Sequence, residues 1–147
     1  MAKMVAGPIA YFEGDYVPVE KAQISVMTHA FNYGTGLFEG IRGYYSESED
    51  NVLIFRLQEH VDRMVRNCRV LSMDIPESPD DLREVCVELV RRSEFREGVY
   101  IRPICYKSEL SLGPQLSNVE SSFCCYIIKL GDYCDIESGL DVMVSSW

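Results

Sequence analysis

The stretch VLIFRLQEHVDRMVRNCRVL, residues 52–71, contains the change of hydrophobic period that decides the fold. Its first residues, Val52 to Phe55, form a short apolar run typical of a buried strand. From Leu57 onward the apolar positions are 57, 61, 64, 65, 68 and 71, which lie on one face of an α-helix. We therefore expect a strand that passes directly into a helix over Leu57 to Leu71.

A second helix is predicted after this one. Ser78 is a suitable N-cap, Pro79 occupies the first helical position, and Asp80 and Asp81 are acidic residues in the first turn. Gly98 is placed to end the helix. Its expected core face consists of Leu82, Val85, Cys86, Leu89 and Val90.

Turn signals divide the remaining apolar segments into strands. The expected strands are Ile9 to Phe12 and Tyr16 to Val19 around the turn Glu13-Gly14-Asp15, then Leu37 to Tyr45, Val99 to Tyr106 and Ser122 to Leu130. A loop with Leu112-Gly113-Pro114 separates the last two. Two helices among about six strands predict an α+β domain over residues 1–130, with both helices on one face of the sheet.

The last residues, 131–147, depart from this pattern. Gly131 to Gly139 is polar, and Leu140 to Ser145 begins a new alternating strand. We expect an interdomain connection and the first strand of a second domain, so that this sequence is the front part of a longer protein. The alternative is an edge strand that pairs backward within the first domain.

Composition narrows the class of protein. The 147 residues include 14 basic and 23 acidic side chains, a net charge of −9, which disfavours nucleic acid and anionic membranes as partners. Neither a membrane-spanning apolar run nor a secretory pattern over Met1 to Tyr11 is present, so we expect a cytoplasmic protein. The six cysteines lie mostly in apolar segments without a Cys-x-x-Cys pair, which predicts reduced thiols. His29 and His60 lack ligand-like spacing, and no metal site is expected.

The run HAFNYGTGLFEGIR, residues 29–42, alternates glycines with aromatic and charged residues. In an extended strand Phe38, Gly40 and Arg42 share one face. An aromatic ring beside a guanidinium is suited to an apolar molecule with an anionic end. A twisted strand with glycine bulges is the alternative interpretation.

Two further segments contain candidate cations. Arg56, His60 and Arg63 share the polar side of the first helix and are suited to a phosphate group, with Glu59–Arg63 and Asp62–Arg66 surface pairs as the alternative. In the strand Val99 to Tyr106, Tyr100 and Arg102 point to one face. A buried Arg102 needs either an internal carboxylate or the carboxylate of a ligand.

Several of these motifs, in this order, resemble the N-terminal part of a branched-chain amino acid aminotransferase, a pyridoxal-phosphate enzyme of fold type IV. The resemblance runs from about Ala10 to Trp147 and rests on short segments. They are His29-Ala30, Tyr33-Gly34, Phe38-Glu39-Gly40-Ile41-Arg42, Phe55-Arg56, Glu59-His60, Arg63, Tyr100-Ile101-Arg102-Pro103 and Val144-Ser145-Ser146-Trp147.

The resemblance implies the small N-terminal domain of that fold, with pyridoxal 5′-phosphate as cofactor. It implies that Arg63 binds the cofactor phosphate. The implied substrate-binding residues are Tyr33, Phe38, Arg42, Tyr100, Arg102 and Tyr133. The implied substrates are branched-chain L-amino acids, glutamate and 2-oxoglutarate, in a homodimer or higher homo-oligomer in which the loop of Leu112-Gly113-Pro114 reaches the neighbouring subunit.

One departure concerns the catalytic lysine. In the family the Schiff-base lysine lies shortly beyond the Ser-Ser-Trp motif, and the only lysines here are Lys3, Lys21, Lys107 and Lys129. We therefore expect this chain to supply binding residues without the catalytic one, and to be inactive alone. Alternative hypotheses are a non-catalytic self-association module, or a fold-type-IV enzyme acting on D-amino acids or amines.

Overall fold

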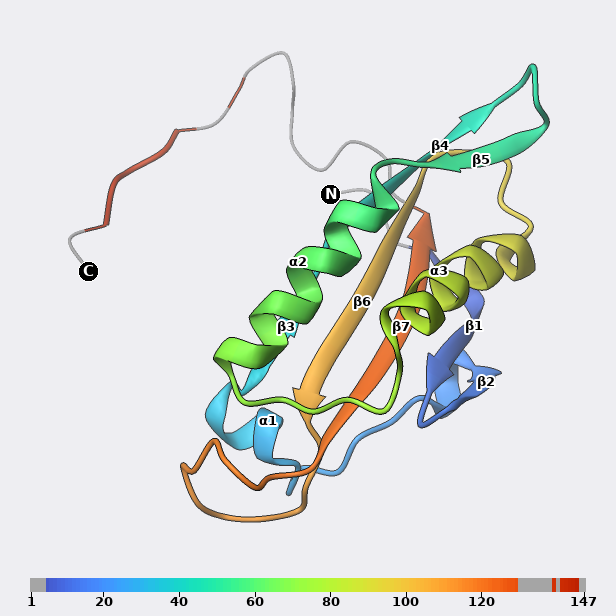
Figure 1. Ribbon diagram of the computed structural model, residues 1–147. Coiled ribbons are helices and arrows are strands. Elements are labelled where there is room, and N and C mark those ends of the chain that lie inside the picture. The colour runs from blue at the N-terminus through green and yellow to red at the C-terminus, as the bar shows by residue number, and fades with distance from the viewer. Residues whose placement is uncertain (1–4, 130–138, 140, 146–147) are drawn as a thin grey trace.

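The computed structural model describes residues 5–129, 139 and 141–145 and confirms an α+β fold. Figure 1 shows two long helices in front of one twisted sheet. The strands are β1 Val5–Phe12, β2 Asp15–Pro18, β3 Gly36–Phe38, β4 Ile41–Ser46, β5 Asn51–Ile54, β6 Val99–Lys107 and β7 Ser121–Lys129. The helices are the 3-10 turn η1 Val19–Lys21, α1 His29–Tyr33, α2 Leu57–Val70 and α3 Pro79–Ser93.

The sheet has seven antiparallel strands in the order β2-β1-β7-β6-β4-β5, and β3 also pairs with β6. The long strands β6 and β7 form its centre, with Val99 opposite Lys129 and Lys107 opposite Ser121. Alternate residues of β6 therefore point to opposite faces of the sheet. Val99, Ile101 and Cys105 are buried under the helices, whereas Tyr100, Arg102 and Ile104 are partly exposed on the other face.

Helices α2 and α3 cover one face of the sheet, as the apolar periodicity predicts (Figure 1). Helix α3 begins at the predicted cap, where the Ser78 hydroxyl accepts from the Asp81 N–H and the Asp81 carboxylate accepts from the Ser78 N–H. The core that these helices form with the sheet includes Val61, Met64, Leu82, Leu89, Ile101, Phe123 and Ile127. No helix in the described part of the chain is long and apolar enough to cross a membrane.

The strand predicted over Leu37 to Tyr45 is interrupted at Glu39-Gly40, so the sheet has seven strands rather than about six. The pairs Phe38 with Ile104 and Ile41 with Ile101 keep one register across the gap, which places Glu39 opposite Pro103. The Glu39 N–H donates to the Pro103 carbonyl at 3.1 Å. Proline has no N–H with which to return the second bond, and the ladder breaks there.

The prediction that Gly98 ends the second helix is wrong. Helix α3 ends at Ser93, and Glu94 follows in the left-handed region with φ 54°. The Ser93 hydroxyl donates to the Val90 carbonyl at 2.7 Å and accepts from the Phe95 N–H at 3.3 Å. A local side-chain bond of this kind competes with continuation of the helix.

Other segments also differ from the sequence-based expectation. The strand expected over Tyr16 to Val19 ends at Pro18, and the short helix α1 forms in a segment for which no element was predicted. Residues 141–145 carry no regular secondary structure, and Val142 is 89% exposed; that this segment is the first strand of a second domain stays a prediction. Tyr133 and Cys134 lie outside the described residues. The five described cysteines are free thiols, as predicted.

Candidate functional site

The face of the sheet opposite the long helices carries four of the candidate residues together. Arg42 pairs with Tyr100 across β4 and β6, and Phe38 pairs with Ile104 across β3 and β6. Arg102 lies two residues beyond Tyr100 on the same side of β6. The alternation predicted for Phe38, Gly40 and Arg42 therefore holds across the gap between β3 and β4. We call Phe38, Gly40, Arg42, Tyr100 and Arg102 the arginine face.

Arg102 is held by aromatic groups rather than by a carboxylate. Its guanidinium carbon lies 4.1 Å from the Phe38 ring centre and 5.0 Å from the Tyr100 ring centre. Its Nη2 donates to the Tyr100 hydroxyl at 2.9 Å, and its buried Nε has no hydrogen-bond partner in the part of the chain that the structure describes. The internal salt bridge considered from the sequence is therefore not formed within the described residues.

Arg42 completes the charge on this face. Its guanidinium carbon lies 5.7 Å from the Tyr44 ring centre, and its buried Nε also has no hydrogen-bond partner among residues 5–129, 139 and 141–145. An unsatisfied buried N–H costs roughly 1–3 kcal/mol. Two cations with unpartnered N–H groups among aromatic rings form a site that an anionic group would stabilise.

Gly40 leaves the space that Tyr100 fills. A Cβ atom at position 40 would lie 2.5 Å from the Tyr100 hydroxyl oxygen and 3.1 Å from two of its ring carbons. The Tyr100 hydroxyl is the same atom that accepts from Arg102. The glycine is therefore needed for a close approach that orients Arg102.

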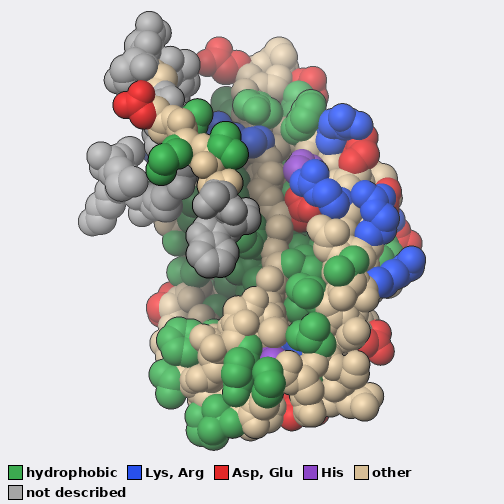
Figure 2. All heavy atoms as spheres, turned by 90° about the vertical axis from the view of Figure 1, so that its left-hand side faces the viewer, with side chains coloured by type: hydrophobic (Ala, Val, Ile, Leu, Met, Phe, Trp, Pro, Cys, Tyr) green, Lys and Arg blue, Asp and Glu red, His purple; other side chains and the backbone are tan. Residues whose placement is uncertain are grey.

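Arg63 lies on α2 and is held by Glu39. The Glu39 carboxylate accepts from Arg63 Nε at 2.6 Å and from His60 Nδ1 at 2.9 Å. Burial raises the pKa of Glu39, but the hydrogen bonds and charges of Arg63 and His60 outweigh it and leave the pKa below its usual range. Figure 2 shows basic, acidic and histidine side chains along the α2 side of the molecule, beside a hollow lined by hydrophobic groups.

The other sequence-predicted cations take different positions. Arg56 precedes α2 with φ 49° and pairs with Glu59 at 2.9 Å, so it does not join His60 and Arg63. Asp62 accepts from Gln58 at 2.8 Å. The predicted surface pairs Glu59–Arg63 and Asp62–Arg66 are therefore wrong, because both acidic groups have nearer partners one turn toward the N-terminus.

Tyr33 lies on α1, outside the strands that carry the arginine face, and is 40% exposed. Its ring centre is 4.8 Å from that of the fully buried His29. The Nδ1 atom of His29 is 2.7 Å from the Thr35 hydroxyl, and Nε2 is 2.7 Å from the Gly113 carbonyl. His29 thus connects α1 to the loop that contains Leu112-Gly113-Pro114.

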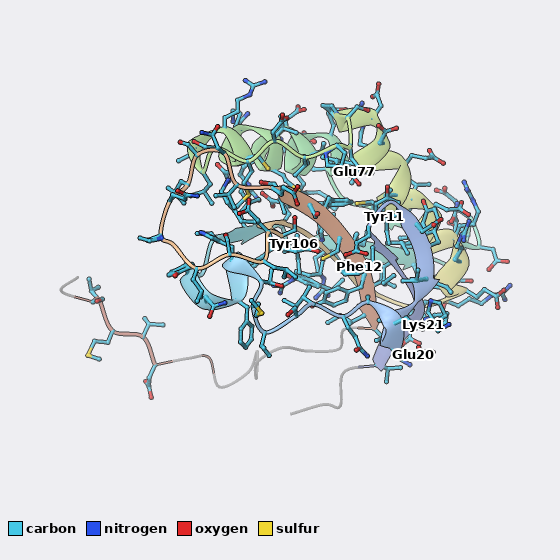
Figure 3. The ribbon with its side chains drawn as sticks, turned by 90° about the horizontal axis from the view of Figure 1, so that it is seen from below. Tyr11, Phe12, Glu20, Lys21, Glu77 and Tyr106 are labelled. Atoms are coloured by element: carbon cyan, nitrogen blue, oxygen red, sulfur yellow. The ribbon has the colours of Figure 1, made fainter. Side chains whose placement is uncertain are left out.

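A separate groove, of about 740 Å³, lies elsewhere and is lined by several acidic residues. Tyr11 and Glu77 line it, and Figure 3 shows these two side chains close together. The Tyr11 hydroxyl donates to Glu77 at 3.2 Å, and burial together with Glu77 raises the pKa of Tyr11 to about 12. Its other acidic residues are Glu13, Asp81, Glu84 and Glu120, so the groove is unsuited to anionic substrates. Among the described residues no cluster of three metal-ligating side chains occurs.

Sequence reasoning assigned no role to Glu39 and His29, two buried residues whose side chains make hydrogen bonds between elements of the fold. A usable signal existed for Glu39. It lies between Leu37 and Ile41 on the helix-facing side of the strand, and a buried carboxylate requires a cation from the covering layer. His29 had no comparable signal for its contact with Gly113, because that residue is distant in the sequence and contributes a backbone atom.

Comparisons with known proteins agree with this fold. Residues 36–139 match the family model described as amino-transferase class IV. A probable branched-chain-amino-acid aminotransferase of Aquifex aeolicus is 44% identical over 147 residues, which is all of this chain and 47% of the relative. The branched-chain-amino-acid aminotransferase of Escherichia coli K12 is 33% identical over 93% of this chain and 45% of its own length.

Solved structures give the same result. The branched-chain aminotransferase of Thermoproteus uzoniensis with norvaline aligns with a TM-score of 0.81 and 32% identity, over 88% of this chain and 43% of that one. The Escherichia coli enzyme aligns with a TM-score of 0.80 and 32% identity, over 96% of this chain and 47% of that one. The chain spans about half the length of the curated relatives that it matches. On its sequence motifs, its fold and the family match over residues 36–139, the chain belongs to the class IV aminotransferases.

Proposed function

We propose that this chain forms the N-terminal, ligand-binding part of a pyridoxal-phosphate-dependent enzyme that transfers the amino group between branched-chain L-amino acids and 2-oxoglutarate. One observation carries the proposal. The arginine face places two guanidinium groups on one side of the sheet, each with a buried Nε–H that has no partner among the described residues, and the exposed ring of Phe38 lies against one of them, Arg102. Such a surface suits substrates that have carboxylates and an apolar side chain.

The residues have separate roles in this proposal. Arg102 and Arg42 bind carboxylates, and the Tyr100 hydroxyl orients Arg102. Glutamate has two carboxylates, and two arginines can bind both of them. Leucine has one carboxylate, so one of the two arginines has no carboxylate of leucine to bind. Phe38, which is 60% exposed, and Tyr33 offer apolar surface for a branched side chain.

The residues present fit the proposed cofactor. Arg63 is half exposed, and its contacts with Glu39 use Nε and Nη2 only, so further N–H groups are available for a phosphate. When bound, pyridoxal 5′-phosphate supplies the electron sink for amino-group chemistry. A further solved branched-chain amino acid aminotransferase contains pyridoxamine 5′-phosphate. It is 38% identical to this chain, with a TM-score of 0.76, over 82% of this chain and 40% of that one.

We further propose that the Schiff-base lysine is not among residues 1–147. Lys107 is buried on the helix-covered side and donates to the Ser72 carbonyl at 2.7 Å. Lys129 pairs with Glu97 at 2.5 Å. Neither amine faces Arg42 or Arg102, and this arrangement supports the prediction that the chain alone is inactive. A cytoplasmic location stays a prediction, supported by the five free cysteines.

A homodimer or higher homo-oligomer is part of the proposal. Several large apolar side chains are exposed around α1 and the loop that His29 holds against it, and Figure 2 shows hydrophobic side chains gathered at this end. They are Val26 at 74%, Phe31 at 66%, Leu110 at 57% and Leu112 at 79% exposure. Exposed apolar groups in such a cluster favour association with a second copy. Sedimentation analysis of the chain measures this association, and we expect the Leu112→Ser variant to associate less than wild type.

The test of the proposed function uses a chimera in which residues 1–147 are followed by the remaining part of the Aquifex aeolicus relative. We expect this chimera to form glutamate from leucine and 2-oxoglutarate, and the 147-residue chain to form none. Turnover of D-amino acids or simple amines in place of leucine would support the alternative substrate class. A folded chimera without any aminotransfer, together with self-association of the chain, would favour the non-catalytic module.

A further inference from the structure

We propose that Glu39 is a positioning residue for Arg63: its buried carboxylate fixes the guanidinium so that the remaining N–H groups face a phosphate group. The inference rests on the proposed function for the identity of that phosphate as the cofactor's.

The contacts of Glu39 are made on both carboxylate oxygens. Oε1 accepts from Arg63 Nε at 2.6 Å, and Oε2 accepts from Arg63 Nη2 at 2.5 Å and from His60 Nδ1 at 2.9 Å. The two bonds from Arg63 form the bidentate arrangement that a planar guanidinium makes with a carboxylate. The side chain of Glu39 is only 5% exposed, so Arg63 and His60, and not water, are its main hydrogen-bond partners.

Stability alone does not account for a glutamate at this position. Position 39 shares the helix-facing side of the strand with Leu37 and Ile41, where an apolar side chain would pack without desolvating a charge. The partner Arg63 is 54% exposed, so the buried carboxylate is compensated by a cation that is half in solvent. A pair of this kind contributes little net stability compared with an apolar residue.

What the carboxylate does provide is orientation. A free arginine side chain loses rotamer entropy when it is fixed, which opposes binding. Glu39 fixes the fork of Arg63 in advance, and three of the five N–H groups stay available on the side away from the carboxylate. Preorganisation of this kind raises affinity because less ordering remains to be done on binding.

The position of Glu39 in the chain links this arginine to the arginine face. Its neighbours are Phe38 and Gly40, and its own N–H is bound to the Pro103 carbonyl at 3.1 Å. The backbone segment that orients Arg63 on the helix side therefore also presents Phe38 on the other side. The two carboxylates of α2 itself do not compete for Arg63, because Glu59 is bound to Arg56 and Asp62 to Gln58.

The experiment follows the arginine Nε–H signals of the 147-residue chain by NMR, with inorganic phosphate as probe. Pyridoxine 5′-phosphate and pyridoxine serve as second probes, because neither has an aldehyde that would react with lysines. We expect the Arg63 Nε–H to exchange slowly with water and to shift with inorganic phosphate and pyridoxine 5′-phosphate but not with pyridoxine. In Glu39→Ala, exchange should be about tenfold faster and the Kd for phosphate about tenfold higher, with Glu39→Gln intermediate.

Glu88→Gln is the matched control. Glu88 also holds arginines, with Arg92 Nε at 2.7 Å, but on the surface of α3. This variant should leave the phosphate affinity of Arg63 unchanged, and the Arg92 Nε–H reports on loss of a surface pair in the same spectra. If Glu39→Ala does not fold, Glu39→Gln decides, because it keeps one acceptor and the shape of the side chain.

Two results would overturn the inference. One is a wild-type Arg63 signal that does not respond to phosphate, and the other is unchanged phosphate affinity in a folded Glu39 variant. The proposed function is decided separately, by aminotransfer in the chimera. An active chimera with an unresponsive Arg63 overturns the role of Glu39 alone, whereas a phosphate-responsive Arg63 with an inactive chimera overturns the proposed function alone.

Discussion

Replacing Gly40 by alanine is the smallest change that tests the arginine face. A Cβ atom there would lie 2.5 Å from the Tyr100 hydroxyl, and real Cβ contacts essentially never fall under 3.0 Å. The hydroxyl must therefore move by at least about 0.5 Å. Its hydrogen bond from Arg102 starts at 2.9 Å, so a movement of this size away from Arg102 takes it beyond the ordinary range of about 3.2 Å.

The expected effect is large on binding and small on folding. A hydrogen bond with a charged group contributes about 1.5–3 kcal/mol, which corresponds to a loss of roughly 10- to 100-fold in kcat/KM for glutamate. Tyr100 is only partly buried and can rotate, at a cost in unfolding free energy of about 0.5–1.5 kcal/mol. Steady-state kinetics of the chimera and urea unfolding of the 147-residue chain measure these two quantities.

Gly36→Ala is the matched control, because a Cβ there meets only ordinary contacts, with the nearest atom at 3.5 Å. This variant on the neighbouring strand should change kcat/KM for glutamate by no more than about twofold. It should change the free energy of unfolding by no more than about 0.5 kcal/mol. A Gly40→Ala enzyme that keeps its kcat/KM for glutamate within twofold of wild type would refute the argument that Tyr100 orients Arg102.

Three further predictions concern the charged groups. Arg102→Met in the chimera should lower kcat/KM more for glutamate than for leucine, since only glutamate has a second carboxylate to bind; equal losses would contradict the assignment. Arg63→Ala should weaken cofactor binding and also lower the unfolding free energy by about 1–3 kcal/mol, because Glu39 is left buried with His60 alone; cofactor titration and urea unfolding check it. The folded-state pKa of Glu39 is lower than its unfolded value of 4.5, so its contribution to stability is present above pH 4.5 and is lost as the pH falls through the folded value. Urea unfolding across this pH range should show that wild type loses unfolding free energy more steeply than Glu39→Gln as the pH falls. Parallel curves for the two proteins would count against the pairing of Glu39 with Arg63.

Much of the fold was predictable because it depends on local periodicity. The apolar positions from Leu57 to Leu71 predict α2, and Ser78 with Asp81 predicts the start of α3. The ends of elements were less predictable. Glu94 ends α3 in a left-handed conformation that glycine usually adopts, and the break between β3 and β4 depends on Pro103, more than sixty residues away in the chain.

The candidate site was predictable in its faces but not in its pairings. Alternation in β6 places Tyr100 and Arg102 on one side whatever the surroundings, and the structure confirms it. The partner of a long charged side chain is decided by contacts between layers, which the sequence does not contain. Arg63 was predicted on the polar side of its helix, and its interaction with Glu39 of another element appears only in the three-dimensional arrangement.

The two best-defined arginines differ in how they are held, and this difference has a chemical consequence. Arg63 is bound by a carboxylate, which cancels much of its charge while fixing its direction. Arg102 is bound by a hydroxyl and two aromatic rings, which fix its direction and leave its charge uncompensated within the described residues. A carboxylate of a substrate that must arrive and leave in each cycle is attracted most by the uncompensated charge of Arg102. A phosphate that stays bound depends more on the direction of its hydrogen bonds, which is the property that Glu39 gives to Arg63.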